Sequence, residues 1–522
     1  MTVVTQHGAL AGLELPGAVT VFRGVRYAQA PVGVLRWKPP VAAAAWREVR
    51  RAVDFGPACP QAPSPPGSIY ALSPRRMSED CLFLNVWRPS QGANAPVMVW
   101  LHGGALRTGD PASGLYDGAR LAGRGVVIVT VNYRLGVLGY LAHPQLSAES
   151  PHATSGNYGL LDQIEALRWV RDNIAAFGGD PGNVTLFGES AGALSAIELM
   201  SSPLATGLFH KVILQSGYLV SNPELKRECL GQPSAESVGE GLARKLGAAD
   251  LAALRVLPAE SLVAMAAAAG FDPQANIDGW VLPRQIVECL DRGGQAAVPM
   301  MVGFNEGEVR SLRSYFLPPL PTSPADYENR VRSLYGDLTP SYLAMYPADD
   351  IEQSALAAAR DAFYGWSAER LARAQTRLGL PAHLYFFAHR YPAQEALGLE
   401  AFHASELPYV FGRIGAPDGW PERWPRPPDD ARERAMSEAI MGYFTSFARV
   451  GVPDVAAAAV WEPYRNERAY LEFRDVPRPG HHLLPGMFEL HEELIARRRA
   501  AGTQHWYLNV GLASPPVPPA AR

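Results

Sequence analysis

The pentapeptide Gly188-Glu-Ser-Ala-Gly192 is the feature that most constrains how this chain can fold. It follows an apolar, β-branched run at 183–187 and precedes an apolar stretch at 193–200. A serine between two glycines can occupy a sharp turn from a strand into a helix, because no bulky neighbour blocks the bend. We therefore predict that Ser190 lies at the end of a strand with its hydroxyl available as a nucleophile.

Runs rich in Val and Ile recur along the chain. They lie at 96–101, 125–131, 184–187, 211–214 and 298–302. Continuous apolar runs of this length fit parallel strands that are covered on both faces. Between two of these runs, residues 161–176 carry apolar side chains at helical spacing. The sequence therefore predicts an α/β fold with a central, mostly parallel sheet flanked by helices.

The remaining segments are interpreted as additions to one large domain. Residues 233–270 are rich in Ala, Leu and Glu, which favours a helical insertion. Stretches rich in Pro and Gly predict long surface loops at 57–74, 317–324 and 415–428. We expect a single domain over residues 1–511 and a disordered, Pro-rich tail at 512–522.

Composition and charge exclude several kinds of partner. The chain is 48% hydrophobic with a formal net charge of −4, so no basic surface for nucleic acid is expected. Its start lacks a basic and apolar leader, and no later run is long enough to span a membrane, so we expect a cytoplasmic protein. The spacing of its four cysteines predicts neither a disulfide framework nor a metal cluster.

A second motif offers donors for a developing negative charge. The residues His102-Gly-Gly-Ala105 directly follow the strand predicted at 96–101. Backbone N–H groups of small residues can approach the oxygen that becomes negative when a carbonyl is attacked. We expect Gly104 and Ala105 to supply two donors, and Ala191, the residue after the nucleophile, to supply a third.

An acid and a histidine should follow the serine in this chain order. Glu306 and Glu308 come after the strand predicted at 298–302, where such sheets place functional loops. By position, either could serve as the acid. Of the seven histidines beyond Glu308, His403 lies in a loop after the strand predicted at 383–387, from which its imidazole could reach back over the sheet.

Together these motifs resemble the type-B carboxylesterase family, which includes bacterial p-nitrobenzyl esterases, animal carboxylesterases and cholinesterases. The resemblance covers almost the whole chain. Besides the two glycine motifs, it is carried by Phe22-Arg-Gly-Val-Arg-Tyr-Ala28, Glu79-Asp-Cys-Leu-Phe-Leu-Asn-Val-Trp87, Gly156-Asn-Tyr-Gly-Leu-Leu-Asp-Gln163 and His403-Ala-Ser-Glu-Leu-Pro-Tyr-Val-Phe-Gly412. It implies the α/β-hydrolase fold and a serine carboxylesterase that acts on small esters without a metal or an organic cofactor.

The resemblance also implies roles for individual residues. Carried over by motif, Ser190 is the nucleophile, His403 the base and Glu306 the acid. Glu306 is preferred to Glu308 because it directly precedes a glycine, as the family's acid does. Supporting polar groups around this triad are implied at Glu189, Ser216 and Glu406.

Two departures from the family pattern bear on the substrate. The third glycine and the following aromatic of the oxyanion run are Ala105 and Leu106, which should reshape the acyl side of the pocket. No tryptophan lies between residues 46 and 87, where cholinesterases place the one that holds a quaternary ammonium, so choline esters are not expected. Cys59 and Cys81 occupy the positions of the family's first disulfide, and we expect both to be reduced.

Two other functions share much of this pattern. The same acyl chemistry can cleave amides and carbamates, so an amidase or a carbamate hydrolase is an alternative. The family also contains adhesion proteins that keep the fold and lose the serine. The presence of Ser190, with an acid and a histidine after it, argues against such a non-catalytic binding protein.

Overall fold

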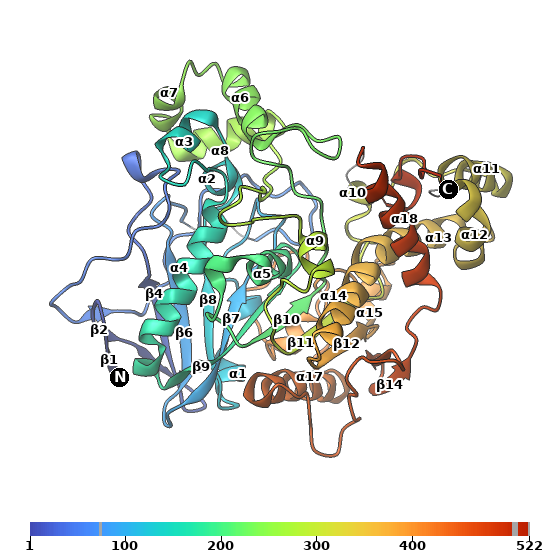
Figure 1. The fold of residues 1–522 in the computed structure, drawn as a ribbon. Coiled ribbons are helices and arrows are strands. Elements are labelled where there is room, and N and C mark those ends of the chain that lie inside the picture. The colour runs from blue at the N-terminus through green and yellow to red at the C-terminus, as the bar shows by residue number, and fades with distance from the viewer. Residues whose placement is uncertain (73–75, 504–509, 520–522) are drawn as a thin grey trace.

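A long mixed sheet runs through the middle of the molecule (Figure 1). The computed structural model describes residues 1–72, 76–503 and 510–519. Within these ranges, eleven strands form this sheet in the order β14-β13-β12-β11-β10-β9-β7-β8-β6-β4-β3. Helices pack on both of its faces, so the predicted α/β fold with a mostly parallel sheet is confirmed.

The seven strands from β13 to β8 in this order run parallel to one another. They are β7 (Ala95–Leu101), β8 (Val127–Val131), β9 (Gly179–Glu189), β10 (Lys211–Gln215), β11 (Met300–Asn305), β12 (Ala382–Phe387) and β13 (Ala469–Phe473). Antiparallel strands extend the sheet at its two ends: β3 (Leu13–Leu15), β4 (Val19–Arg26), β6 (Phe83–Pro89) and β14 (Pro477–His481). A small second sheet pairs β1 (Thr2–Thr5), β2 (Gly8–Ala11) and β5 (Arg50–Arg51).

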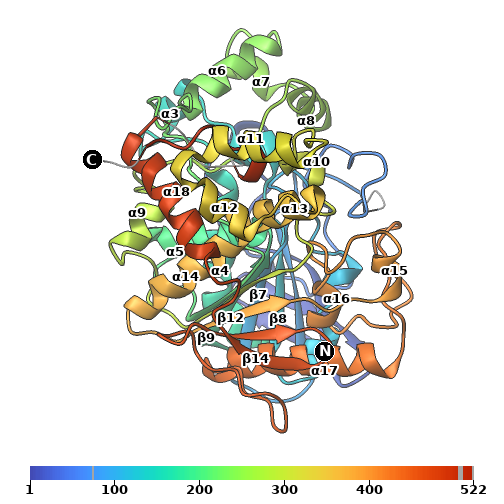
Figure 2. The same ribbon diagram turned by 90° about the vertical axis from the view of Figure 1, so that its right-hand side faces the viewer.

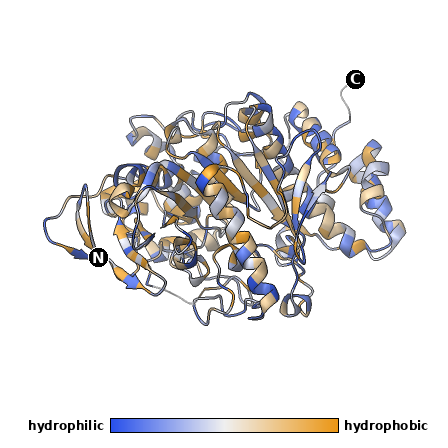
Figure 3. Cartoon of the chain, turned by 90° about the horizontal axis from the view of Figure 1, so that it is seen from below, coloured by the Kyte–Doolittle hydropathy of each residue, from blue (hydrophilic) through white to orange (hydrophobic). Residues whose placement is uncertain are grey.

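The central strands are apolar along their whole length because both of their faces are covered. Alternate side chains of β10 enter two different hydrophobic clusters: Val212 and Leu214 point to one face, and Ile213 points to the other. The first face is covered by α4 (Tyr158–Asn173), α5 (Ala191–Ser201) and α14 (Trp366–Arg377). The second is covered by α1 (Ala119–Ala122) and the long α17 (Ala431–Val450), as Figure 2 shows for α17. Figure 3 shows the same pattern as hydrophobic strands between helices with hydrophilic outer faces.

The other helices lie in the connections between strands, except for α18, which follows the last strand. They are α2 (Gly136–Tyr140), α3 (Pro144–Glu149), α6 (Ala235–Lys245), α7 (Leu251–Arg255), α8 (Ala259–Ala268), α9 (Ile286–Asp291), α10 (Arg313–Phe316), α11 (Pro324–Tyr335), α12 (Thr339–Met345), α13 (Ile351–Arg360), α15 (Pro392–Glu395), α16 (Leu407–Val410) and α18 (Met487–Ala501). Residues 233–270 hold α6, α7 and α8, in agreement with their helical composition. Within the described ranges, no helix has both the length and the hydropathy needed to cross a bilayer.

The C-terminal segment packs against the body of the protein. Leu512 is only 1% exposed, the Tyr335 hydroxyl donates to Gly511 O at 2.9 Å, and Val517 N donates to Leu334 O at 2.7 Å. The prediction of a disordered tail is therefore wrong for residues 512–519, whereas 520–522 lie outside the described residues. The prediction used only the composition of the tail. It could not include the contacts that the tail makes with α11 in the folded protein. The single-domain division at 1–511 stays a prediction.

The turn between β9 and α5 is the tightest packing point near the end of the sheet. A Cβ on Gly188 would lie 2.6 Å from the carbonyl carbon of Gly192, so the two glycine backbones touch across the turn. A Cβ on Gly192 would lie 2.0 Å from Leu101 O and 2.8 Å from His102 O, both at the end of β7. The two glycines of the pentapeptide are therefore required by backbone contacts, as well as by the bend itself.

Replacing Gly192 by alanine should lower the free energy of unfolding by about 1–3 kcal/mol, because the new methyl group must push two backbone segments apart. Urea denaturation followed by circular dichroism measures this change. Gly241→Ala, within α6, is the matched control: its Cβ would meet only the end of the Arg244 side chain, at 3.9 Å. That variant should be neutral or slightly stabilised. Equal losses in the two variants would contradict the packing argument.

Candidate active site

Ser190 occupies a strained turn between β9 and α5. Its backbone has φ 55° and ψ −123°, in a region that L-residues seldom adopt. Its N–H donates to Gln215 O at 2.9 Å, and its carbonyl accepts from Leu194 N at 2.9 Å. Hydrogen bonds on both sides of the residue therefore hold the strained conformation. The half-buried side chain is left at the carboxyl end of the parallel strands.

The glycine loop after β7 lies directly against this serine. A Cβ on Gly103 would lie 3.1 Å from Ser190 Cβ and 2.7 Å from Glu189 Oε2. A Cβ on Gly104, which has φ 112°, would lie 2.1 Å from Thr108 O. Neither position can accept a side chain without a shift of the backbone. The loop is thus packed directly against Ser190 and Glu189 at Gly103, and is folded tightly on itself at Gly104.

Three backbone N–H groups are available beside the serine. In the part of the chain that the structure describes, neither Gly104 N nor Ala105 N donates to a protein acceptor. Ala191 begins α5, and the first N–H groups of a helix have no partner within it. Ala105 has φ 54°, so the alanine adopts the left-handed conformation that a glycine would take there. The structure therefore leaves all three expected donors free to bind an oxyanion.

His403 is a buried histidine held between two carboxylates. Its residue is 5% exposed, and it lies in the loop between β12 and α16. Nδ1 is hydrogen-bonded to Glu308 Oε2, and Nε2 lies 3.0 Å from Glu189 Oε1. Among the described residues, Ser190 Oγ makes no hydrogen bond to this imidazole. The structure thus brings His403 together with Glu308 and Glu189 at the nucleophile elbow.

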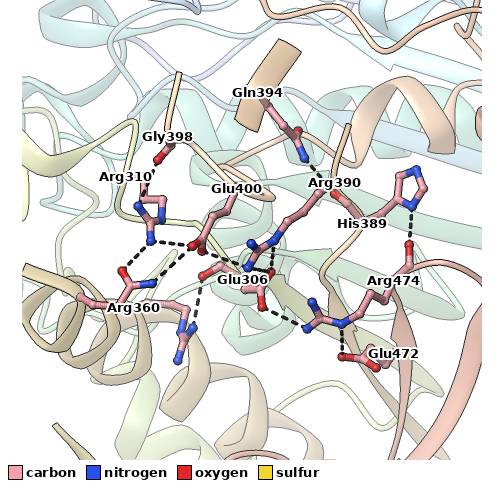
Figure 4. Close-up of polar contacts among 11 residues, drawn as sticks. Glu306, Arg310, Arg360, His389, Arg390, Gln394, Gly398, Glu400, Glu472 and Arg474 are labelled. Carbon is pink, nitrogen blue, oxygen red and sulfur yellow. Dashed lines mark hydrogen bonds and ion pairs between the residues drawn. The ribbon is translucent and has the colours of Figure 1, made fainter. Parts of the chain in front are cut away.

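The expectation that Glu306 pairs with the histidine is wrong. Glu308, which is fully buried, makes that contact, and its other oxygen accepts from Ser216 Oγ at 2.5 Å and from Asn305 N at 2.7 Å. Glu306 is instead bound to arginine side chains, as Figure 4 shows. The two glutamates flank Gly307, where the chain turns, and they make contacts in different directions. The glycine that follows Glu306, the local signal used to choose between them, does not select the residue that contacts His403.

The three supporting residues expected from the sequence all lie around His403. Ser216 donates to Glu308, and Glu189 contacts Nε2, as described above. Glu406 Oε1 accepts from Gln215 Nε2 at 3.0 Å, and its Oε2 accepts from Asn305 Nδ2 at 2.6 Å. Gln215 and Asn305 were not anticipated, because isolated amide side chains carry no motif. They could be recognised only as the last residues of β10 and β11.

The charges of this cluster are strongly coupled. Burial alone would lower the pKa of His403, but Glu189 and Glu308 more than offset this effect and raise it well above its usual value. Burial, together with the charge of Glu189, raises the pKa of Glu406 to about 8. This shift favours the protonated form of Glu406 near neutral pH, which limits the negative charge around the imidazole.

Aromatic side chains surround the imidazole on its remaining sides. The Tyr364 ring lies 5.3 Å from the His403 ring between centroids and is carried by a π-helical turn at Asp361–Gly365. Tyr70 packs edge-on against His403 and against Trp424. The Tyr70 hydroxyl donates to His403 O at 2.9 Å. Aromatic rings therefore flank the imidazole in addition to the buried carboxylates that contact its two nitrogens.

The described residues contain no candidate metal-binding cluster and no disulfide. In those ranges, no group of three or more His, Cys, Asp or Glu side chains is placed to hold a metal ion. Cys59, Cys81, Cys229 and Cys289 are present as free thiols. Cys59 and Cys81 are buried, and Cys59 Sγ accepts a hydrogen bond from Leu135 N at 3.3 Å.

Comparison with known proteins identifies the relatives of this site. The profile described as "Carboxylesterase family" matches residues 1–484. The chain belongs to the carboxylesterase family. It is 37% identical to the fumonisin B1 esterase of Sphingopyxis macrogoltabida, over 90% of this chain and 85% of that protein. It is 35% identical to the para-nitrobenzyl esterase of Bacillus subtilis, over 89% of this chain and 93% of that protein.

Solved structures agree with this assignment. One structure of a PNB esterase superposes with a TM-score of 0.80 and 33% identity, and covers 94% of this chain and 99% of that one. Mouse liver carboxylesterase 1 is 32% identical over 96% of this chain and 93% of that protein. The protein is therefore a carboxylic ester hydrolase with the α/β-hydrolase fold, and the family, fold and enzyme class predicted from the sequence are confirmed.

Ester hydrolysis by this carboxylesterase should rise with pH through the raised pKa of His403, because only the neutral imidazole can accept a proton. Glu189→Gln removes one charge that favours the cation. The acidic limb of kcat/KM should therefore move to lower pH in that variant. Initial rates on a p-nitrophenyl ester across the neutral range measure the shift. Asp429→Asn, at an exposed ion pair with Arg434, should leave the limb unchanged. If the acidic limb stays at the same pH in Glu189→Gln, the conclusion that Glu189 raises the pKa of His403 is contradicted.

Proposed function

We propose that Ser190, His403 and Glu308 form the catalytic triad of this carboxylesterase. The observation that carries this proposal is the Nδ1 hydrogen bond between His403 and Glu308, at a turn where Ser190 adjoins a glycine loop and a helix start with unpaired backbone N–H groups. A buried carboxylate on Nδ1 fixes the imidazole tautomer that leaves Nε2 able to accept a proton. It also stabilises the cation that forms when Nε2 takes that proton.

The first half of the reaction forms an acyl-enzyme. His403 Nε2 takes the proton of Ser190 Oγ as this oxygen attacks the ester carbonyl. The N–H groups of Gly104, Ala105 and Ala191 donate to the resulting oxyanion, and each such donor contributes about 10²–10³ in rate. His403 then returns the proton to the departing alcohol. Water, activated by the same histidine, attacks the acyl-enzyme and releases the acid.

Glu189 has a role in the resting enzyme. Its Oε1 lies 3.0 Å from His403 Nε2, the nitrogen that must face Ser190 Oγ during catalysis. Catalytic hydrogen bonds are often loose before the substrate binds and tighten in its complex. Glu189 thus holds the imidazole beside the serine until an ester carbonyl enters the oxyanion hole.

The apolar surroundings favour esters with aromatic or alkyl groups. Tyr364 and the Tyr70–Trp424 pair flank the histidine, and the buried Leu106 follows the oxyanion run. The names of two relatives, a fumonisin B1 esterase and a para-nitrobenzyl esterase, support small-molecule esters as the substrate class. Amides and carbamates remain alternatives that the substrate comparison below distinguishes. A cytoplasmic location also stays a prediction.

Ser190→Ala should abolish hydrolysis while the protein stays folded, because the alanine cannot form the acyl-enzyme. The measurement is the initial rate on p-nitrophenyl acetate, butyrate and octanoate and on p-nitrobenzyl acetate, with a matched anilide and phenyl carbamate beside them. Fast, serine-dependent cleavage of the esters alone supports the proposal. Faster cleavage of the anilide or the carbamate would favour the amidase or carbamate hydrolase. Near-normal ester turnover by Ser190→Ala would exclude this nucleophile.

Glu308→Gln should lower kcat by about 10³- to 10⁴-fold, because an amide on Nδ1 can favour the wrong imidazole tautomer and cannot stabilise the cation. Steady-state rates on p-nitrophenyl butyrate measure this loss. Glu306→Gln is the matched comparison, since it makes the same change two residues away. If Glu306→Gln lost more activity than Glu308→Gln, the assignment of the acid to Glu308 would be refuted.

A further inference from the structure

Glu306 is a partly buried carboxylate that the proposed reaction does not use. It directly follows β11, and its side chain is 15% exposed. Its Oε2 accepts a hydrogen bond from Arg390 Nε at 2.8 Å, and its Oε1 accepts from Arg474 Nη2 at 3.0 Å (Figure 4). Arg360 Nη1 donates to its backbone carbonyl at 3.2 Å. One side chain therefore holds two cations from distant parts of the chain.

These contacts join the ends of three neighbouring strands. Glu306 N donates to Phe387 O at 2.9 Å, which continues the pairing of β11 with β12. Arg390 lies shortly after β12, and Arg474 directly follows β13. The two ion pairs therefore fix the start of the loop that leaves β12. The same connection continues through α15 to His403.

The backbone beside Glu306 also holds a later part of the same loop. Gly307 N donates to Ala401 O at 2.7 Å. A Cβ on Gly307 would lie only 2.3 Å from Leu399 O, so the two backbones touch without room for a side chain. The segment that carries Glu306 is thus packed directly against the residues that precede His403.

A chain of alternating charges connects these two anchoring points. Arg390 Nη2 lies 3.5 Å from Glu400 Oε2, and Arg310 Nη2 donates to Glu400 Oε1 at 2.6 Å (Figure 4). Arg310 Nη1 donates to Gly398 O at 3.0 Å. Loss of the negative charge at Glu306 would remove the one carboxylate that Arg390 and Arg474 share, and would leave Arg390 with Glu400 at 3.5 Å and Arg474 with Glu472 at 3.0 Å.

We propose that Glu306 is a positioning residue for His403, whose loop it fixes through ion pairs with Arg390 and Arg474. The inference rests on the proposed role of His403 as the base. The two arginine side chains are 33% and 38% exposed, so their ion pairs contribute little to the free energy of unfolding. Catalytic geometry is more demanding, because a displacement of about 1 Å can cost about a hundredfold in rate. The contribution of Glu306 therefore lies in turnover.

The test is kcat per active site in Glu306→Gln, with active sites counted by titration with a fluorophosphonate. We expect kcat on p-nitrophenyl butyrate to fall by about tenfold to a hundredfold, with KM nearly unchanged. Glu306→Asp keeps the charge and should recover part of kcat. A role limited to stability would lower the melting temperature or the number of active sites, and would leave kcat per site unchanged. Unchanged kcat per site would overturn the proposal.

Two further variants keep the test decisive. Asp475→Asn removes a nearby carboxylate that is 63% exposed and paired with Arg432, and it should retain the wild-type kcat. If Glu306→Gln does not fold, Arg474→Gln replaces it, because that change removes one ion pair and leaves Glu306 bound to Arg390. A lower kcat per site in Arg474→Gln supports the proposal, and an unchanged one contradicts it.

The wild-type enzyme separates this inference from the proposed function. If wild type lacks ester hydrolysis that depends on Ser190, the proposed mechanism fails. If wild type is active and Glu306→Gln equals it in kcat per site, only the positioning role fails. A double-mutant cycle of Glu306→Gln with Arg474→Gln adds a check, since losses that act through one contact should not add.

Discussion

The site depends on the close approach of α5 to the end of β7. Gly192 has no side chain, and a Cβ there would overlap Leu101 O at 2.0 Å, so the first turn of α5 can reach the strand end. This contact brings Ala191 N beside the loop that carries Gly104 N and Ala105 N. The proposed nucleophile and the proposed oxyanion donors of the glycine loop follow two strands, β9 and β7, that are neighbours in the sheet and distant in the sequence. Without this contact the two motifs would not form one site.

A second constraint is the balance of buried charge. Glu189, Glu308 and Glu406 are all buried around the single imidazole of His403. Removing carboxylates from water is costly unless they are paired and hydrogen-bonded. The imidazole pairs with two of them, and burial raises the pKa of the third to about 8, which favours its neutral form. The pairing that offsets the cost of burying these carboxylates also raises the pKa of His403.

A third feature is that two nearby glutamates contact different parts of the site. Glu308 contacts the imidazole, whereas Glu306 contacts the arginines that anchor the loop behind it. Both flank Gly307, whose backbone pairs with Ala401. A short turn at the end of β11 therefore reaches both the reacting histidine and the base of its loop. This explains why a carboxylate with no chemical role lies so close to the triad.

The fold and the principal motifs could be predicted because they are local. Runs of Val and Ile specify strands that are buried on both faces, and two glycines around a serine specify a sharp strand-to-helix turn. Two predictions were wrong. The motif rule selected Glu306 because a glycine follows it, whereas Glu308 contacts His403. Composition predicted a disordered tail because it does not include the contacts that the tail makes with α11. Both errors concern contacts with residues far away in the chain.

The sequence by itself determined the α/β architecture, and it located the two glycine motifs and the candidate serine, acid and histidine in their chain order. Each of these follows from the properties of a few consecutive residues. Only the tertiary structure decided which glutamate meets His403, where the other one points, and how three carboxylates share one imidazole. The physical reason is that these outcomes depend on the pairing of β11 with β12 and on the return of the loop at 398–403, and such contacts exist only when the whole sheet has formed.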